Sequence, residues 1–414
     1  MLYNSPLSQT KSEIYNMRLL HTALTRVLIV LLLPLISMLP RASAQEVQLP
    51  KHLNPAMEHL LAGVGLTTAA TLNQDLAGSL IDYVAAPKQM QSSYSMGPRQ
   101  GAVSSYYEFK LERPFAVVMN LIYHPDIPAY ITAPASVRLS RWIEINGSRQ
   151  PLPRITAELD GLAAPMIVNG VEFVENTPDI NTGAYYAYEQ ERTLILMKYQ
   201  GRRVLLSISR QRDRSTVGKK GLVLGADDDW NYLYTGEKGL TRKGLGWVDS
   251  YMYQAQAITI YYETYDPVPH VKCGIFKWLH AGWAGINMAK PDHLRNGMQR
   301  FAKAFKTVVE ELAHDAPDQM AKVFAHIDSL PTKTLRQKAR DQHALLSSVY
   351  RHDKSLGTKW FRRLFKDDRY CQGLGREELK ALLGKAYLKF MLGKAQGVDV
   401  SALNPHKWLM AHDW

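Results

Sequence analysis

The 414-residue sequence predicts an α+β protein with an antiparallel, β-rich middle domain, a short helical preface and an all-helical, basic C-terminal region. Three observations carry this prediction. Tyrosine favours strands, and 17 of the 22 tyrosines fall between Tyr83 and Tyr265. Asn-Gly and Gln-Gly pairs, which suit tight hairpin turns, separate apolar segments in the same region. Beyond residue 290, apolar residues recur at helical spacing.

The composition excludes several classes of protein. Hydrophobic residues make up 46% and charged residues 21%, so the chain is neither disordered nor fibrous. The net charge of +12 is uneven: residues 1–44 carry +3, residues 45–270 carry −2 and residues 271–414 carry +11. Basic proteins often bind nucleic acid, but no such module is recognisable, so no nucleic-acid partner is expected.

Residues 1–44 are predicted to be a secretory signal peptide. Arg18 and Arg26 precede an apolar run, and the small residues Ala42 and Ala44 suit the pocket of a signal peptidase. Cleavage is therefore expected after Ala44.

Cleavage there would leave Gln45 at the new N-terminus, and Met17 is an alternative translation start. An uncleaved anchor is the weaker alternative, because the apolar run is shorter than the about 20 residues that a spanning helix needs. The mature chain is expected to be exported. In a bacterial host it would reside in the periplasm or outside the cell.

Residues 45–101 are predicted to form the helical preface and a linker. Asn54-Pro55 offers an N-cap followed by proline at the first helical position. A second helical pattern runs from Leu72 to Val84, and a polar stretch with Ser, Gly and Pro then reaches Gly101.

Residues 102–268 are predicted to form an antiparallel sheet, because short turns connect the apolar segments. Asn146-Gly147, Asn169-Gly170 and Gln200-Gly201 are the expected turns. The expected strands are 104–111, 115–123, 137–145, 166–174, 192–199, 204–210 and 247–263.

Residues 269–414 are assigned to the basic helical region. Amphipathic patterns predict helices over 291–312, from 317, over 334–350 and over 377–392. The apolar stretch 274–289 is expected to be buried between the sheet and the helices, with a loop dipping into a membrane as the alternative.

Catalytic signatures such as G-x-S-x-G, H-E-x-x-H and the Walker loop are absent, and no cofactor is expected. Asp227 and Asp229 belong to the densest cluster of oxygen ligands. The EF-hand pattern fails there because Tyr232 stands where the loop needs glycine. An acidic turn is therefore favoured over a metal site.

Cys273 and Cys371 are the two cysteines. In an oxidising compartment they could pair, and closing a loop of about 100 residues would contribute about 4 kcal/mol. Two buried free thiols are the other outcome, and the sequence leaves both open.

A short helix over residues 359–366 would place bulky aromatics opposite cations. This pattern is typical of a helix that lies on an anionic lipid surface. The commoner arrangement, in which the aromatics pack into the protein core, remains favoured. The residues that would contact a membrane are Lys359, Trp360, Phe361, Arg362, Arg363, Phe365 and Lys366.

The sequence does not determine the molecular function. The leading hypothesis is an exported, non-catalytic envelope protein. It would bind an apolar ligand or a protein partner, and its basic region would contact an anionic membrane surface. One alternative is an exported hydrolase with a site assembled from dispersed residues, which predicts a deep pocket with convergent polar groups and a residue of perturbed pKa. Another is a structural subunit of an envelope assembly. The oligomeric state is not predicted.

Overall fold

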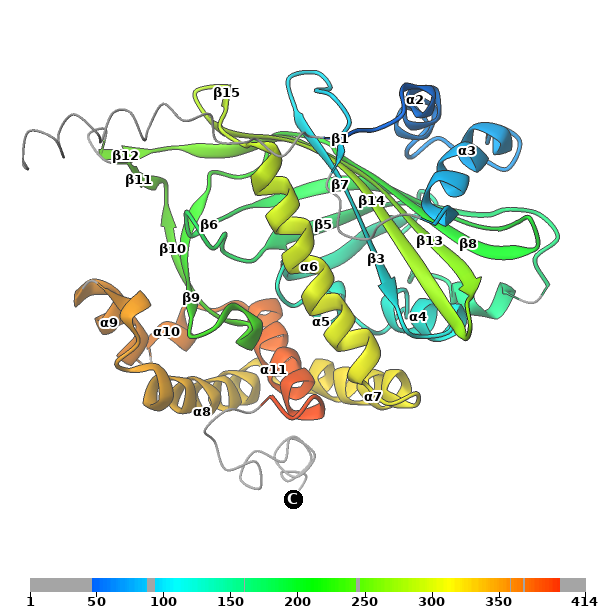
Figure 1. The fold of residues 1–414 in the computed structure, drawn as a ribbon. Coiled ribbons are helices and arrows are strands. Elements are labelled where there is room, and N and C mark those ends of the chain that lie inside the picture. The colour runs from blue at the N-terminus through cyan, green and yellow to red at the C-terminus, as the bar shows by residue number, and fades with distance from the viewer. Residues whose placement is uncertain are drawn as a thin grey trace, which may run out of the picture. The chain divides into compact units, whose positions relative to one another are not determined.

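The structure is a computed structural model that describes residues 47–87, 94–159, 161–242, 246–357, 359–367 and 369–394. The predicted signal peptide and its cleavage site lie outside these residues. A large, mainly antiparallel sheet is combined with helices toward the C-terminus (Figure 1), which confirms the predicted α+β class. Within the described ranges, no helix is both long and apolar enough to cross a membrane.

A ten-stranded sheet forms the centre of the fold. Its strands pair in antiparallel fashion, apart from the parallel pair β1 and β2, and β15 (Ile286–Asn287) adds to β14. The order across the sheet is β1 (Val47–Gln48), β2 (Tyr94–Ser95), β3 (Val103–Leu111), β14 (Pro269–Trp283), β13 (Ser250–Tyr265), β8 (Arg202–Gln211), β7 (Ala187–Tyr199), β5 (Met166–Asn176) and β4 (Val137–Ile145).

The hairpin of β7 and β8 shows why these residues form a sheet. Gln200 and Gly201 at its turn have φ values of 49° and 75°, so the predicted turn is confirmed. Within the apolar run of β7, Leu194 contributes to the core beneath the C-terminal helices, whereas Ile195 contributes to the core beneath the N-terminal helices. A strand that is buried on both faces has a continuous run of apolar residues, which explains the apolar run of β7.

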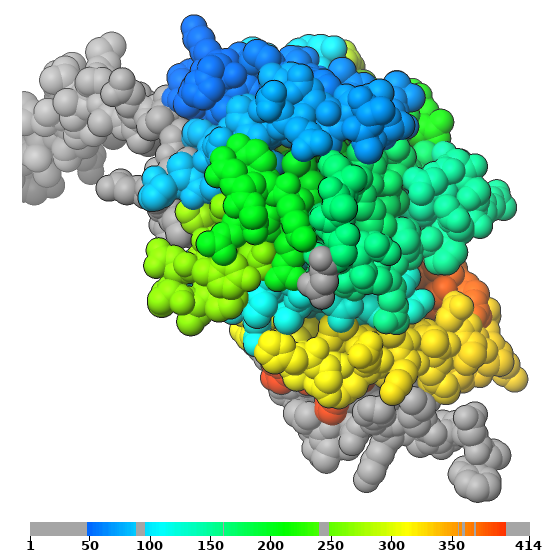
Figure 2. Space-filling view, turned by 90° about the vertical axis from the view of Figure 1, so that its right-hand side faces the viewer, coloured from blue at the N-terminus to red at the C-terminus, as the bar shows by residue number. Residues whose placement is uncertain are grey.

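Helices cover both faces of the sheet. The predicted preface forms α2 (Asn54–Ala62) and α3 (Gln74–Ala85), whose buried residues share a core with β8 and β13. The long helix α6 (Pro291–Glu311) crosses the opposite face, where Phe305 meets Phe109 of β3 edge to face at 6.2 Å between ring centroids. Figure 2 shows strand residues in green between the N-terminal helices in blue and the later helices in yellow.

One predicted strand, 115–123, is wrong, because these residues form helix α4 (Phe115–Ile122). Phe115, Val118 and Met119 are buried at the spacing of one helical face. A short, wholly apolar run fits a buried helix as well as a buried strand, so the pattern alone did not distinguish them.

The predicted turn at Asn169-Gly170 is also wrong, because both residues lie within β5. A Cβ atom at Gly170 would come 2.7 Å from the backbone oxygen of Glu144 in the neighbouring β4. This glycine therefore permits close approach of two strands. The Asn146-Gly147 turn is confirmed by φ values of 48° and 75°.

The helical region begins later than the sequence suggested. Residues 269–283 form β14, which lies between β13 and β3 near the centre of the sheet, and helices resume at Pro291. Phe276 and Trp278 are buried in the sheet, whereas Ile286 at the following turn is 53% exposed. The boundary assumed after residue 268 thus separates two paired strands.

A smaller sheet and the last helices complete the described chain. This sheet has the order β10 (Asn231–Lys238), β9 (Lys219–Leu224), β6 (Ala184–Tyr185), and a ribbon of β11 (Leu240–Arg242) and β12 (Gly246–Val248) follows it. The helices are α5 (Ala129–Thr132), α7 (Ala316–Ser329), α8 (Thr332–Tyr350), α9 (Lys359–Lys366), α10 (Arg369–Gln372) and α11 (Arg376–Met391). The predicted helical C-terminal part is thereby confirmed for the described residues from 291 to 391.

Candidate functional site

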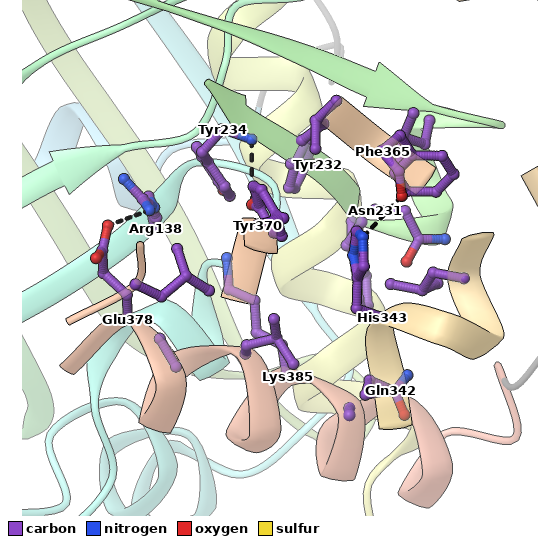
Figure 3. A pocket seen from close by; sticks show the side chains of 18 of the residues that line it. Arg138, Asn231, Tyr232, Tyr234, Gln342, His343, Phe365, Tyr370, Glu378 and Lys385 are labelled. Carbon is purple, nitrogen blue, oxygen red and sulfur yellow. Dashed lines mark hydrogen bonds and ion pairs between the residues drawn. The ribbon is translucent and has the colours of Figure 1, made fainter. Parts of the chain in front are cut away.

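A cavity lies between β10 and the helices α8, α10 and α11 (Figure 3). Its volume is about 80 Å³. The polar lining consists of Arg138, Asn231, Tyr232, Tyr234, Gln342, His343, Tyr370, Glu378, Lys385 and Lys389. The apolar lining consists of Leu224, Trp230, Leu233, Leu346, Phe365, Leu374, Ala381, Leu382 and Ala386.

Trp230 lies in the turn between the 3-10 helix η3 (Asp227–Asp229) and β10. Its φ of 54° is in the left-handed region, which a bulky residue rarely adopts. The residue is 3% exposed, and its Nε1 has no hydrogen-bond partner within the described part of the chain. Lys394 places its Nζ 5.0 Å from the centroid of the ring. A strained backbone and an unsatisfied donor therefore meet at the cavity wall.

Two of the three acidic residues before Trp230 are paired with cations. Asp227 accepts hydrogen bonds from Nε of Arg300 at 2.7 and 2.9 Å, and Asp228 accepts one from Nζ of Lys303 at 2.8 Å. Over the described ranges, no group of His, Cys, Asp and Glu side chains is arranged to hold a metal ion. Of the weak metal candidates, Asp227 thus anchors η3 to α6 and Asp229 accepts a hydrogen bond from the backbone N–H of Ala226 at 3.2 Å.

Arg138 of β4 joins the central sheet to α11. Its guanidinium forms ion pairs with Glu175 of β5 and Glu378 of α11, and lies 3.9 Å from the ring centroid of Tyr234. Burial is the largest single influence and opposes the charge of Arg138, but the attractions to Glu175, Glu378 and the neighbouring phenols together outweigh it and raise the pKa. The guanidinium is therefore charged, and its charge is balanced within the cavity wall.

Two lysines one helical turn apart on α11 bring amines to the cavity. Nζ of Lys385 donates to the backbone oxygens of Val137 at 2.7 Å and Pro134 at 3.2 Å. Nζ of Lys389 donates to Oδ1 of Asn231. Burial is the main cause that lowers the pKa of both amines, well below the usual range for Lys385 and to about 7 for Lys389. Lys389 can therefore change its charge near neutral pH.

An aromatic cluster forms another part of the lining. The imidazole of His343 stacks on Tyr370 at 4.8 Å, and its Nε2 donates to the backbone oxygen of Phe365 at 2.8 Å. The hydroxyl of Tyr370 accepts a hydrogen bond from the backbone N–H of Tyr234 at 3.3 Å. Burial raises the pKa of Tyr370 to about 12 and also raises that of Tyr232 and Tyr234. These phenols stay protonated and can donate.

The predicted membrane-contact segment forms α9. Phe365 is 1% exposed and packs into a small core with Leu224, Leu233 and Leu356, which Phe361 and Leu364 also contact. The aromatic side therefore packs into the protein in this structure. The exposed cations are Arg362, Arg363 and Lys366, whereas the side chains of Lys359 and Trp360 lie outside the described part. Contact of this helix with lipid stays a prediction that rests on the three exposed cations.

The two cysteines are buried and are not bonded to each other. Cys273 lies in β14 near the centre of the sheet, and Cys371 lies in α10 beside α8. The structure therefore does not contain the disulfide that the sequence left open. Burial raises the pKa of the Cys273 thiol, which keeps it protonated.

The sequence analysis did not identify the cavity. Lys385 and Lys389 have the spacing of an ordinary solvated basic face, and they come together with Asn231 and Trp230 only through the tertiary fold. One feature of α11 could have indicated the cavity: apolar residues such as Leu382, Ala386 and Phe390 lie close to the lysines in the sequence. A helix with apolar residues on most sides is buried, and its lysines are then buried too.

Comparison with known proteins adds no family. No family model matches the chain, and no curated protein matches it. Among solved structures, the human StarD13 (DLC2) lipid transfer and protein localization domain aligns with a TM-score of 0.24 and 11% identity, over 57% of this chain and 93% of that one. A similarity this low supports no argument about fold or function, so the inferences below rest on the residues themselves.

Proposed function

We propose that the protein binds a small organic molecule in the cavity between β10 and α11, without transforming it chemically. The observation that carries this proposal is the pair of α11 amines, Lys385 and Lys389, in a cavity whose lining also includes leucine, alanine and aromatic side chains. Small-molecule sites are typically apolar cavities with a few placed polar groups.

The hydrolase alternative gains one of its expected features, because the cavity has convergent polar groups and an amine of perturbed pKa. Hydrolysis also needs an activated nucleophile next to a base. The described residues that line the cavity include no Ser, Thr or Cys, and its tyrosines are held protonated by burial. Nε2 of His343 already donates to a backbone oxygen. Binding therefore accounts for the lining better than hydrolysis does.

A filled-cavity variant tests the proposal. Ala386→Phe places a ring in the cavity, whereas Ala164→Phe adds the same ring on an exposed loop and serves as the matched control. Binding of the neutral probes indole and benzamide is measured by ligand-observed NMR and calorimetry. We expect binding to the wild type and to Ala164→Phe, and its loss in Ala386→Phe. Equal binding by all three proteins, or no binding by the wild type, would refute the proposal.

Export is part of the proposed function. Its support is the leader itself: cations before an apolar run, followed by Ala42 and Ala44 at a cleavage motif. In a bacterial envelope, the exposed cations of α9 would meet anionic lipid or an envelope protein. The basic C-terminal third of the chain, which carries +11, is consistent with such a surface.

A further inference from the structure

We propose that the ligand of this cavity is an organic anion whose acidic group is held by Lys389 and Trp230, with its apolar body against Leu346, Leu382 and Ala386. The inference rests on the binding function proposed above and names the class of its ligand. Carboxylates and phosphate monoesters share the chemistry that these donors recognise.

Lys389 and Trp230 have hydrogen-bond donors without an acceptor among the described residues. A lysine ammonium has three N–H groups, and the described chain gives Nζ of Lys389 one hydrogen-bond acceptor, Oδ1 of Asn231. Trp230, the residue next to Asn231, carries a buried Nε1 that has no acceptor among the described residues. A buried donor without a partner is destabilising, so an acceptor on a ligand would be stabilising.

The nearby acidic groups are already engaged. Glu378 pairs with Arg138. Asp229 accepts hydrogen bonds from the backbone N–H of Ala226 at 3.2 Å and from the hydroxyl of Tyr350 at 3.2 Å. The amines of α11 are thus the groups of the lining whose positive charge an anion could complement.

Charged and titratable groups from several elements surround Lys389. Asp229 of η3 favours its charge, whereas Lys394, beyond the end of α11, opposes it, and burial opposes it most. The other titratable residues of the cavity are Lys385 and Glu378 from α11, Arg138 from β4, Tyr232 and Tyr234 from β10, His343 from α8 and Tyr370 from α10. Tyr350 of α8 is linked to Lys389 through Asn231.

The backbone at Trp230 supports a functional role for this corner. A bulky residue in the left-handed region costs free energy, and such strain concentrates at binding sites. Here the left-handed conformation occurs at the residue that directly precedes Asn231, the partner of Lys389.

Because the charge of Lys389 changes near neutral pH, binding of an anion beside it should depend on pH. The pKa of Lys389 is about 7 in the unliganded protein, and an anion beside the amine would raise it. Above this pH, binding must therefore take up a proton, and affinity must fall as pH rises. A neutral ligand of the same shape would show neither effect.

The test compares benzoate with its neutral isostere benzamide, by calorimetry on the wild-type protein in two buffers of different ionisation enthalpy. The measurements are made roughly one pH unit below and one above the Lys389 pKa of about 7. At the lower pH, benzoate should bind about tenfold or more tightly than benzamide, as expected for hydrogen bonds to a charged donor. At the higher pH, its binding should weaken and take up a proton.

Lys389→Met should remove the preference for benzoate while binding of benzamide is retained, which shows that the cavity is still formed. Lys303→Met is the matched control, since it removes a lysine whose side chain is 70% exposed, and it should change neither ligand's binding. Phenyl phosphate and inorganic phosphate are the further probes. Phenyl phosphate binding more tightly than inorganic phosphate supports an organic anion.

The outcomes separate this inference from the proposed function. Benzamide binding as tightly as benzoate, or benzoate affinity that does not change with pH, would overturn the anion inference alone. Inorganic phosphate binding as tightly as phenyl phosphate would overturn the organic part of the ligand. No binding of benzamide, indole or any anion would refute the binding function itself.

Discussion

Nζ of Lys389 donates a hydrogen bond to Oδ1 of Asn231, which joins the last helix to β10 at the cavity. Nδ2 of Asn231 donates to the hydroxyl of Tyr350 at 3.0 Å, and that hydroxyl donates to Oδ2 of Asp229 at 3.2 Å. Polar contacts thus connect α11, β10, α8 and η3 through one lysine. Because burial brings the pKa of Lys389 to about 7, the charge at this end of the connection depends on pH.

Removing Lys389 should change how stability depends on pH. Its folded pKa of about 7 lies below the ordinary value of 10.5, so between these values the unfolded chain binds the extra proton. The free energy of unfolding therefore rises with pH across this window, by up to about 1.4 kcal/mol per unit from this residue. In Lys389→Met that slope should disappear, with a gain in stability at neutral pH. Urea unfolding at a series of pH values measures it.

Lys303→Met serves as the control for this slope. The hydrogen bond from Lys303 to Asp228 raises the lysine pKa, so both the folded and the unfolded chain hold this proton throughout the window. The slope should equal that of the wild type. A slope that stays unchanged in Lys389→Met would contradict the burial of its amine.

Replacing Arg138 should be strongly destabilising. Arg138→Met leaves the carboxylates of Glu175 and Glu378 without their shared partner, and breaking a buried ion pair this way costs about 3–5 kcal/mol. Arg212→Met removes an exposed pair with Glu189, whose side chains are 45% and 49% exposed, and should cost under about 1 kcal/mol. Chemical denaturation compares them. Equal costs would show that Arg138 does not join the sheet to α11.

Two helical glycines should respond oppositely to alanine. A Cβ at Gly384 of α11 would lie 2.8 Å from the ring of Phe324, so Gly384→Ala should destabilise by about 1–3 kcal/mol. A Cβ at Gly297 of α6 would meet nothing within 4 Å, so Gly297→Ala should stabilise by up to about 1 kcal/mol. Thermal unfolding measures both. A stabilising Gly384→Ala would contradict the packing of α11 against α7.

The cysteines should behave as inaccessible thiols. Cys273 and Cys371 are buried and form no disulfide, so a thiol reagent should modify neither in the native protein and both after unfolding. Intact mass should be the same with and without reductant. A mass lower by two hydrogen atoms before reduction would instead show a disulfide.

Export and surface contact can be tested on the produced protein. N-terminal sequencing after export should start at Gln45, and a different start would contradict cleavage after Ala44. The exported protein should co-sediment with anionic vesicles and not with neutral ones. Each cation near such a surface contributes about 1 kcal/mol, so reversing the three exposed charges of α9 to Glu should abolish binding.

A matched charge reversal elsewhere provides the control for this experiment. Lys51, Arg149 and Arg212 are exposed cations in other parts of the described chain. Changing these three to Glu should leave binding largely intact if α9 forms the contact. Equal partition of the wild type onto neutral and anionic vesicles would remove the surface-contact proposal.

Much of the fold could be predicted because local patterns agreed with tertiary packing. The turn at Gln200-Gly201 and the amphipathic pattern of α6 needed no distant information. The segment 115–122 could not be assigned, because a continuous apolar run has no alternation of polar and apolar residues that would distinguish a helix from a strand. Strand β14 pairs with the preceding β13 and with the distant β3 and has core residues on both faces, so it lacks the alternating pattern that marks a half-buried strand and was placed in the helical region.

The cavity could be predicted least of all. It is assembled from β4, β9, β10 and four helices, and its key contact joins Lys389 to Asn231 across the fold. The Asp227–Asp229 run drew attention as a metal candidate, whereas its structural consequence is to position Trp230 at the cavity wall. The spacing of residues along one helix or strand does not show which residues of other elements they contact.

Methyl NMR during titration with benzamide and benzoate tests the central claim, ligand binding in this cavity, most directly. The account predicts saturable shifts for the methyl groups of Leu346, Leu382 and Ala386, which line the cavity. It predicts no shifts for Leu60 and Ile81, which lie in the core beneath the N-terminal helices. Unchanged cavity methyls at saturating ligand, or equal shifts in both groups, would contradict it.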